Sequence, residues 1–227
     1  MRGAGLKLLA CFGLIGLLAP MAKAQDVKMS MDAAVMSDLV DRGLSLSDED
    51  PSASFGIFAD LGRHLYSGLT VASIDDFMGN DARISGIVGL SLPLDAYQLD
   101  LSVLADGFVG GDGFVTPEIR ARLSRDLGLF VAAAGVSYAP DGRWSLRNQD
   151  VLYSYLETEV PIPRLSWLTA VAHVGYELFD GAANKTDWGM GLAAGYQAFE
   201  FSLNYEDSDR NDPRGDARLV AALRVFF

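Results

Sequence analysis

The sequence predicts an all-β protein: a single up-and-down antiparallel transmembrane β-barrel of about 12 strands, preceded by a cleaved signal peptide. Three observations support this prediction: alternating apolar and polar residues, an uneven set of connections, and an amphipathic final segment. In residues 218–227 one set of alternate side chains is wholly apolar, whereas the other set carries Arg218 and Arg224. Successive side chains of a strand point to opposite faces, so this segment fits a wall between lipid and water. A final strand ending in Phe227, behind a secretion leader, is typical of bacterial outer-membrane barrels.

Residues 1–24 have the anatomy of a secretory signal peptide. Arg2 and Lys7 precede an apolar run over 8–21, and residues 22–24 (Ala-Lys-Ala) form a small-x-small cleavage site. The apolar run is too short for a membrane-spanning helix. Cys11 faintly resembles a lipoprotein cleavage site, but the apolar run continues well beyond it. We therefore expect a signal peptide at 1–24 and one barrel domain at 25–227.

Charge and cysteine content exclude several classes of partner. The 18 basic residues include three in the leader, so the rest of the chain carries 15 of them against 30 acids, a net charge of −15. This balance argues against nucleic acid as a partner. The single cysteine lies in the leader, so we expect no disulfide and no cysteine-bound metal in residues 25–227.

Alternation divides the remaining chain into twelve predicted strands. In one of them Phe201 and Leu203 alternate with Ser202 and Asn204. A soluble antiparallel sandwich shows the same alternation, so the pattern alone leaves both folds open. The predicted strands are 32–44, 53–62, 65–74, 82–92, 95–106, 114–124, 127–138, 149–160, 165–178, 187–196, 198–206 and 216–227.

The connections between these strands favour the barrel. Every second connection is tight, as at 93–94 and 125–126, and those between are longer and rich in Asp, Gly, Ser and Asn, as at 45–52 and 207–215. Outer-membrane barrels have this asymmetry, with short periplasmic turns and longer outer loops. We therefore expect a bacterial outer-membrane protein with both termini periplasmic and the Asp-rich loops outside.

Charged residues on the non-apolar strand faces are expected to line a wet lumen. In a sandwich they would have to face solvent, because burying so many unpaired charges is costly. Opposed arcs of charge select ions in wide pores, but inter-strand ion pairs that fill a narrow barrel would give the same sequence pattern. The candidate pore-lining residues are Asp38, Arg42, Asp60, Asp100, Glu118, Arg120, Arg122, Glu157, Glu159, His173, Glu177, Glu200, Arg218 and Arg224. Asp187 and Glu206 lie on the same non-apolar strand faces.

Two weaker patterns leave alternatives open. Ser154, Ser166 and Asp187 could in principle join His173 in a hydrolase site, but no nucleophile elbow of the form G-x-S-x-G is present. The Asp-rich segment 207–216 could hold a divalent ion, yet its spacing misses an EF-hand loop and a solvated turn is the alternative. We predict no catalytic residue, no cofactor site and no metal site.

The first predicted hairpin resembles that of the TorF family of outer-membrane porins. The family's early motif, D-Y-x-x-R-G-x-S followed by a proline and a glycine, is matched except that Leu39 replaces the usual aromatic residue. Similar stretches follow at 66–68 and 73–75, where Ile74 replaces the usual Asn, and later at 159–163, 172–176 and 225–227. The matching motif residues are Asp38, Arg42, Gly43, Ser45, Pro51 and Gly56.

The resemblance covers most of residues 25–227 and implies a small outer-membrane channel without catalytic residues. With the acidic lumen, it predicts passive diffusion of small polar solutes or ions with a weak preference for cations. A closed structural or surface-interaction barrel without conductance is the alternative, and an outer-membrane hydrolase is a third. The expected partners are outer-membrane lipid, small polar solutes and the barrel-assembly machinery, the last through the strand that ends at Phe227.

Overall fold

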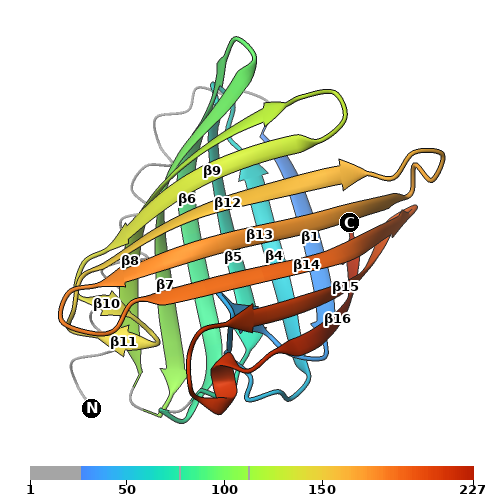
Figure 1. Cartoon of the computed structure of the whole chain (residues 1–227). Helices are drawn as coiled ribbons and strands as arrows, with labels where there is room; N and C mark the ends of the chain where they lie inside the picture. The colour runs from blue at the N-terminus through green and yellow to red at the C-terminus, as the bar shows by residue number, and fades with distance from the viewer. Residues whose placement is uncertain (1–26, 77, 112) are drawn as a thin grey trace.

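The computed structural model describes residues 27–76, 78–111 and 113–227, so the predicted signal peptide lies outside the described residues. Twelve long strands and two short hairpins make up nearly all of the regular structure (Figure 1). The long strands are β1 (Lys28–Met36), β4 (Ser52–Asp60), β5 (Leu65–Ser73), β6 (Asn80–Leu94), β7 (Tyr97–Gly110), β8 (Phe114–Asp126), β9 (Val131–Ala139), β12 (Val151–Pro161), β13 (Leu168–Phe179), β14 (Lys185–Tyr196), β15 (Phe199–Ser208) and β16 (Arg218–Phe226).

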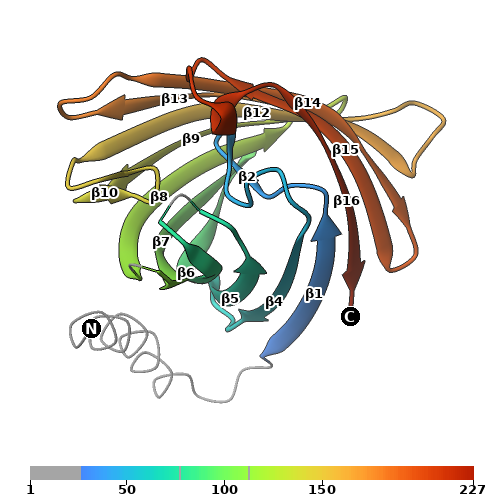
Figure 2. The ribbon, with the colours of Figure 1, turned by 90° about the horizontal axis from the view of Figure 1, so that it is seen from below.

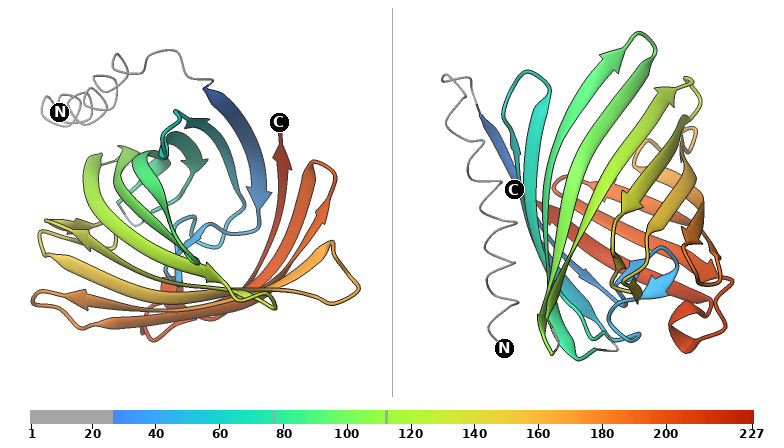
Figure 3. Two further views of the ribbon diagram at one scale, coloured as in Figure 1. Left: turned by 90° about the horizontal axis from the view of Figure 1, so that it is seen from above. Right: turned by 90° about the vertical axis from the view of Figure 1, so that its left-hand side faces the viewer.

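The twelve long strands close into one antiparallel barrel. Each strand pairs with its neighbour along the chain, and β1 closes the ring by pairing with β16, with Asp32 opposite Phe226 (Figure 3). At the end of this seam the Phe227 amide donates to the Met31 carbonyl at 2.9 Å. Closure pairs every edge strand. The predicted all-β, twelve-stranded up-and-down barrel is confirmed.

The two faces of the wall differ as the alternation predicted. On β15, Phe199, Phe201 and Leu203 are each about half exposed, and the side chains between them are polar. The same pattern leaves large apolar side chains on the outer surface of the other strands. Among the described residues, no helix is long and apolar enough to cross a membrane.

The ends of the barrel carry different connections. One end of the barrel, called the turn end here, has the connections 61–64, 95–96, 127–130, 162–167 and 197–198. The start of β1 and the end of β16 also lie at the turn end. The opposite end, the loop end, has the connections 37–51, 74–79, 111–113, 140–150, 180–184 and 209–217. The lengths do not alternate strictly as predicted, because β7 and β8 extend until three residues join them.

One predicted strand is wrong. The sequence predicted a strand over residues 32–44, but β1 begins at Lys28 and ends at Met36. The chain then turns into the barrel and forms a small hairpin from β2 (Val40–Asp41) and β3 (Leu44–Ser45). Figure 2, seen from below, shows β2 within the ring of barrel strands. Asp38 and Arg42 therefore lie on this inserted loop, not on the wall strand where the sequence predicted them.

Candidate functional site

The loop plug, residues 37–51, fills the loop end of the lumen. Arg42 and Gly43 occupy the two turn positions of the β2–β3 hairpin, with φ of 52° and 71°. Two consecutive residues at positive φ make the tight turn whose twist matches paired strands. Asp38 fixes the base of the loop, since one carboxylate oxygen accepts from Ser45 and Ser47 at 2.7 and 2.8 Å.

Apolar side chains from three connections and from strand β7 pack together at the loop end. Leu44, Leu46, Ile74, Phe108 and Trp144 are all buried against one another. Phe108 also stacks on Phe114, with ring centroids 4.4 Å apart. A second short hairpin, β10 (Gly142–Arg143) with β11 (Leu146–Arg147), contributes Trp144 to this cluster. Because these contacts join the plug to two other loops and to strand β7, the cluster fixes the plug in one position.

Arg42 joins the plug to the barrel wall. Its guanidinium donates to Glu118 on β8 at 2.8 Å and to Glu177 on β13 at 3.2 Å. It also donates to Ser137 at 3.0 Å and lies over the ring of Tyr153, 4.0 Å from the ring centroid. Its side chain is 9% exposed. These contacts tie the hairpin to four adjacent strands, β8, β9, β12 and β13.

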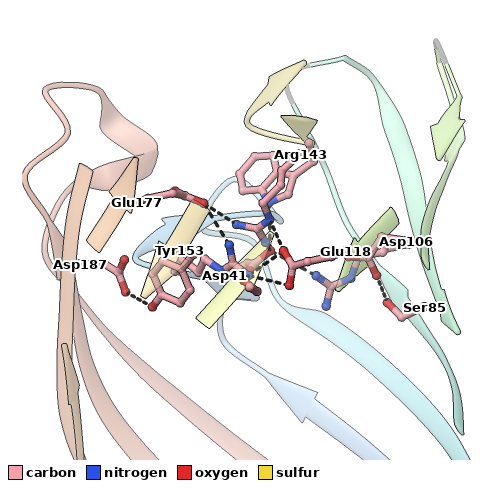
Figure 4. Close-up of polar contacts among 12 residues, drawn as sticks. Asp41, Ser85, Asp106, Glu118, Arg143, Tyr153, Glu177 and Asp187 are labelled. Atoms are coloured by element: carbon pink, nitrogen blue, oxygen red, sulfur yellow. Dashed lines mark hydrogen bonds and ion pairs between the residues drawn. The ribbon is translucent and has the colours of Figure 1, made fainter. Parts of the chain in front are cut away.

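Arg143 binds the same carboxylates from the β10–β11 hairpin (Figure 4). It pairs with Asp41 at 2.6 Å, Glu177 at 2.9 Å and Glu118 at 3.3 Å. Burial alone would raise the pKa of Asp41, but the positive charges of Arg143 and Arg83 outweigh it and hold that pKa well below its usual range. Burial would lower the pKa of Arg143, and the facing carboxylates raise it instead. Both groups are therefore charged.

A buried lysine completes the network. Lys185 is fully buried and pairs with Glu177 at 3.4 Å and with Asp187 at 3.2 Å. Its ammonium also donates to the Arg42 carbonyl. Glu177 thus has three cationic neighbours and is itself fully buried. A buried charged group is stable only when opposite charges compensate it, so the ion pairs between plug and wall stabilise both.

A chamber of two adjoining cavities lies along β8 to β15. The larger, about 230 Å³, is lined by residues including Arg120, Tyr155, Glu157 and His173. The smaller, about 160 Å³, shares Glu157 and His173 with it and adds Glu206. Arg122 pairs with Glu157 at 2.5 Å and His173 Nε2 lies 3.4 Å from Glu206. Several predicted lumen residues therefore come together in one chamber.

The other predicted lumen residues either pair with residues of this network or lie toward the turn end. Arg120 pairs with Glu118, and Arg122 reaches Asp100 at 4.0 Å. Arg218 pairs with Asp38 at 2.8 Å at the base of the plug. Three residues lie toward the turn end: Asp60 accepts from the Gly62 amide at 2.8 Å, and Glu200 stands opposite Arg224. Glu159 lines the smaller cavity.

Four members of the network were not predicted from the sequence: Asp41, Arg83, Arg143 and Lys185. Arg83 belongs to it because its guanidinium lies 3.6 Å from the Asp41 carboxylate. Asp41 and Arg143 lie on loops, whose positions strand alternation does not determine. Lys185 fell within a predicted loop, although it begins β14. Gly43 inside a predicted strand was the available signal, because glycine weakens a strand and adopts the positive φ of a tight turn at no steric cost.

Glycines beneath two tyrosines shape the chamber wall. A side-chain carbon at Gly135 would meet the ring of Tyr155, and one at Gly175 would meet the ring of Tyr153. Each ring therefore lies flat over a neighbouring strand instead of projecting into the lumen. The two rings also stack, with centroids 5.4 Å apart.

Replacing Gly135 by Leu is expected to displace the Tyr155 ring toward the chamber and narrow it. Any passage of ions through this lumen should then fall while the barrel stays folded. Single-channel recording measures the loss, and heat-dependent gel mobility reports folding. Gly195→Leu is the matched control, because a side-chain carbon at that position has no neighbour within 4 Å. Equal effects of the two variants would contradict the role assigned to Gly135.

The hydrolase candidates do not come together. Ser154 stands opposite Tyr176 and Val136, on the strand face away from Tyr153 and the lumen, and Ser166 lies in the connection 162–167 at the turn end. His173 has Asp187 at 3.8 Å, with no serine among its described partners. In the segment 207–216, Asp207 accepts from Tyr205 and Asp212 caps the 3-10 helix η2 (Pro213–Gly215). Among the described residues no three His, Cys, Asp or Glu side chains are placed to hold a metal ion.

A closed barrel with an apolar exterior and a charged interior is the fold of outer-membrane porins, and solved structures share it. The NanC porin superposes with a TM-score of 0.63 at 10% identity, covering 88% of this chain and 99% of that one. The KdgM porin gives 0.60 at 9% identity, covering 87% and 99%. An outer membrane channel from Pseudomonas putida F1 gives 0.53 at 12% identity, covering 91% and 97%.

The sequence itself places the chain in a family. Residues 21–222 match the family described as "Bacterial protein of unknown function (Gcw_chp)", and the chain belongs to it. A search of curated proteins finds no matching sequence. The structural likenesses therefore establish the fold, and the resemblance to TorF-family porins stays a prediction.

Proposed function

We propose that this protein is a porin-like channel of the bacterial outer membrane, related to the TorF family, through which small polar solutes or ions diffuse passively. The observation that carries the proposal is a closed wall with apolar side chains outside and charged side chains inside. In lipid, every backbone polar group must be paired within the protein, and a closed sheet meets that need. The porin fold of the solved structures supports the same class.

Outward side chains support membrane insertion. Val103, Ile119, Leu156, Met190 and Leu219 are each more than half exposed. In water such a surface would be an aggregation liability, whereas in a bilayer it is the required exterior. Trp167, Tyr196 and Phe227 are exposed at the turn end, where they fit an interfacial aromatic girdle. With the turn end in the periplasm, the strand ending at Phe227 would also meet the assembly machinery there.

Two acids in the chamber that have no Lys or Arg partner among the described residues support a weak cation preference. Among the described residues no Lys or Arg pairs with Glu159 or Glu206, whereas the neighbouring arginines Arg120 and Arg122 are each paired with a carboxylate. A wall with surplus negative charge attracts cations and repels anions.

The loop plug favours the second candidate, a closed structural or surface-interaction barrel. Its buried ion pairs and its apolar cover lie across the loop end. We nevertheless favour the channel, because the chamber below the plug has free volume lined by charged groups.

Planar-bilayer recording of the purified, heat-modifiable barrel is expected to show small discrete conductance steps. A potassium chloride gradient should give a reversal potential that indicates cation preference, and raising the salt concentration should weaken it through screening. Folded protein without conductance steps would favour the closed barrel. A reversal potential of the opposite sign would contradict the predicted cation preference but not the channel function.

A further inference from the structure

We propose that the chamber is a binding subsite for small zwitterions that carry one ammonium and one carboxylate, such as amino acids. This inference rests on the proposed function, because the subsite would act on solutes that enter the lumen. It goes beyond weak cation preference, since it requires both signs of charge at defined places on the wall.

The positive side of the chamber is Arg120 on β8. Arg120 donates from its Nε to Glu118, yet its side chain is 35% exposed. The other arginines nearby are more fully engaged: Arg42 by Glu118, Glu177 and Ser137, and Arg122 by Glu157. Arg120 is therefore the guanidinium best placed to receive a carboxylate from a solute. Ser137 and Tyr155 line the same cavity and can donate hydroxyl hydrogen bonds.

The negative side is Glu206 on β15. His173 Nε2 lies 3.4 Å from its carboxylate, and among the described residues no Lys or Arg pairs with it. Asn204 lines the same cavity, and its side-chain oxygen is buried with no hydrogen-bond partner among the described residues. Glu159 adds a second carboxylate. An ammonium group carries three donors, so it can satisfy acceptors of this kind together.

The strand register explains how the two sides share one space. Glu157, His173, Gly189 and Glu206 lie opposite one another on consecutive strands. Gly189 has no side chain, and a carbon added there would meet His173 and Glu206. This gap lets the smaller cavity reach Glu206, while Glu157 and His173 also line the larger cavity beside Arg120. Positive and negative groups thus line neighbouring parts of the same wall.

Three probes with one carbon skeleton test the proposal: γ-aminobutyrate, butylammonium and butyrate. Calorimetric titration of the full barrel in detergent measures binding without requiring conductance. We expect γ-aminobutyrate to bind at least about tenfold more tightly than either singly charged probe, because it can make one more charge-assisted contact. Equal affinity for butylammonium, or no binding of any probe, would overturn the subsite.

Two variants locate the binding. Arg120→Gln and Glu206→Gln are each expected to weaken γ-aminobutyrate binding about tenfold. Arg120→Gln should leave butylammonium binding unchanged, and Glu206→Gln should leave butyrate binding unchanged. Asp95→Asn and Arg164→Asn, in connections at the turn end, are the matched controls and should bind as wild type.

The test also separates this inference from the proposed function. A barrel that conducts potassium chloride but does not prefer γ-aminobutyrate retains the channel function and loses the subsite. A barrel that binds γ-aminobutyrate as predicted but shows no conductance retains the subsite and loses the channel function. Unchanged γ-aminobutyrate binding in both variants would overturn the assigned position.

Discussion

Replacing residues 38–50 by Asn-Gly is expected to raise the single-channel conductance several-fold. Met36 on β1 stands opposite Ser52 on β4, so a two-residue turn can join the strands once the plug is removed. The deletion removes Arg42 and the two leucines of the apolar cover. It leaves Ser37, which bonds the backbone of Ala221 across the seam. Planar-bilayer recording at fixed salt measures the change.

A point variant tests the same idea with less disturbance. Arg42→Asn removes the contacts to Glu118 and Glu177 but keeps a residue that tolerates positive φ. Arg143 remains as a counter-charge for both carboxylates. We expect longer open times and a smaller conductance increase than in the deletion. Arg164→Asn, also at positive φ but at the turn end, is the matched control and should behave as wild type. Unchanged conductance in both plug variants would show that solutes do not pass the loop end.

Replacing Glu177 by Ala is expected to lower the free energy of unfolding by about 3–5 kcal/mol, the usual cost of removing one partner from a buried ion network. The variant leaves Arg42, Arg143 and Lys185 with fewer compensating charges in a fully buried place. Denaturant unfolding of the barrel in lipid vesicles, followed by tryptophan fluorescence, measures the change. Trp144 lies in the apolar cover, so its emission should report early loosening of the loop end.

Asp180→Ala is the control for this measurement. Asp180 is exposed in the connection directly after β13, and its loss should change stability by no more than about 0.5 kcal/mol. A Glu177→Ala barrel as stable as this control would mean that the network contributes little to holding the plug.

Strand alternation predicted the wall well because lipid and water impose opposite demands on its two faces. Phe201 and Glu206 could be assigned to opposite faces from sequence alone, since a one-residue slip would exchange every side chain. Arg143 could not be placed, because its position depends on where a loop folds, and no local periodicity encodes that. Arg42 was misplaced for the same reason: the contacts that hold it inside the barrel are with Glu118 and Glu177, which are far away in the sequence.

The contact between Asp38 and Arg218 has a consequence for biogenesis. Asp38 follows the first barrel strand, and Arg218 begins the last one. The two side chains can meet only after the final strand has arrived beside the first. The last of the contacts that hold the base of the inserted hairpin therefore forms only when the ring is completed.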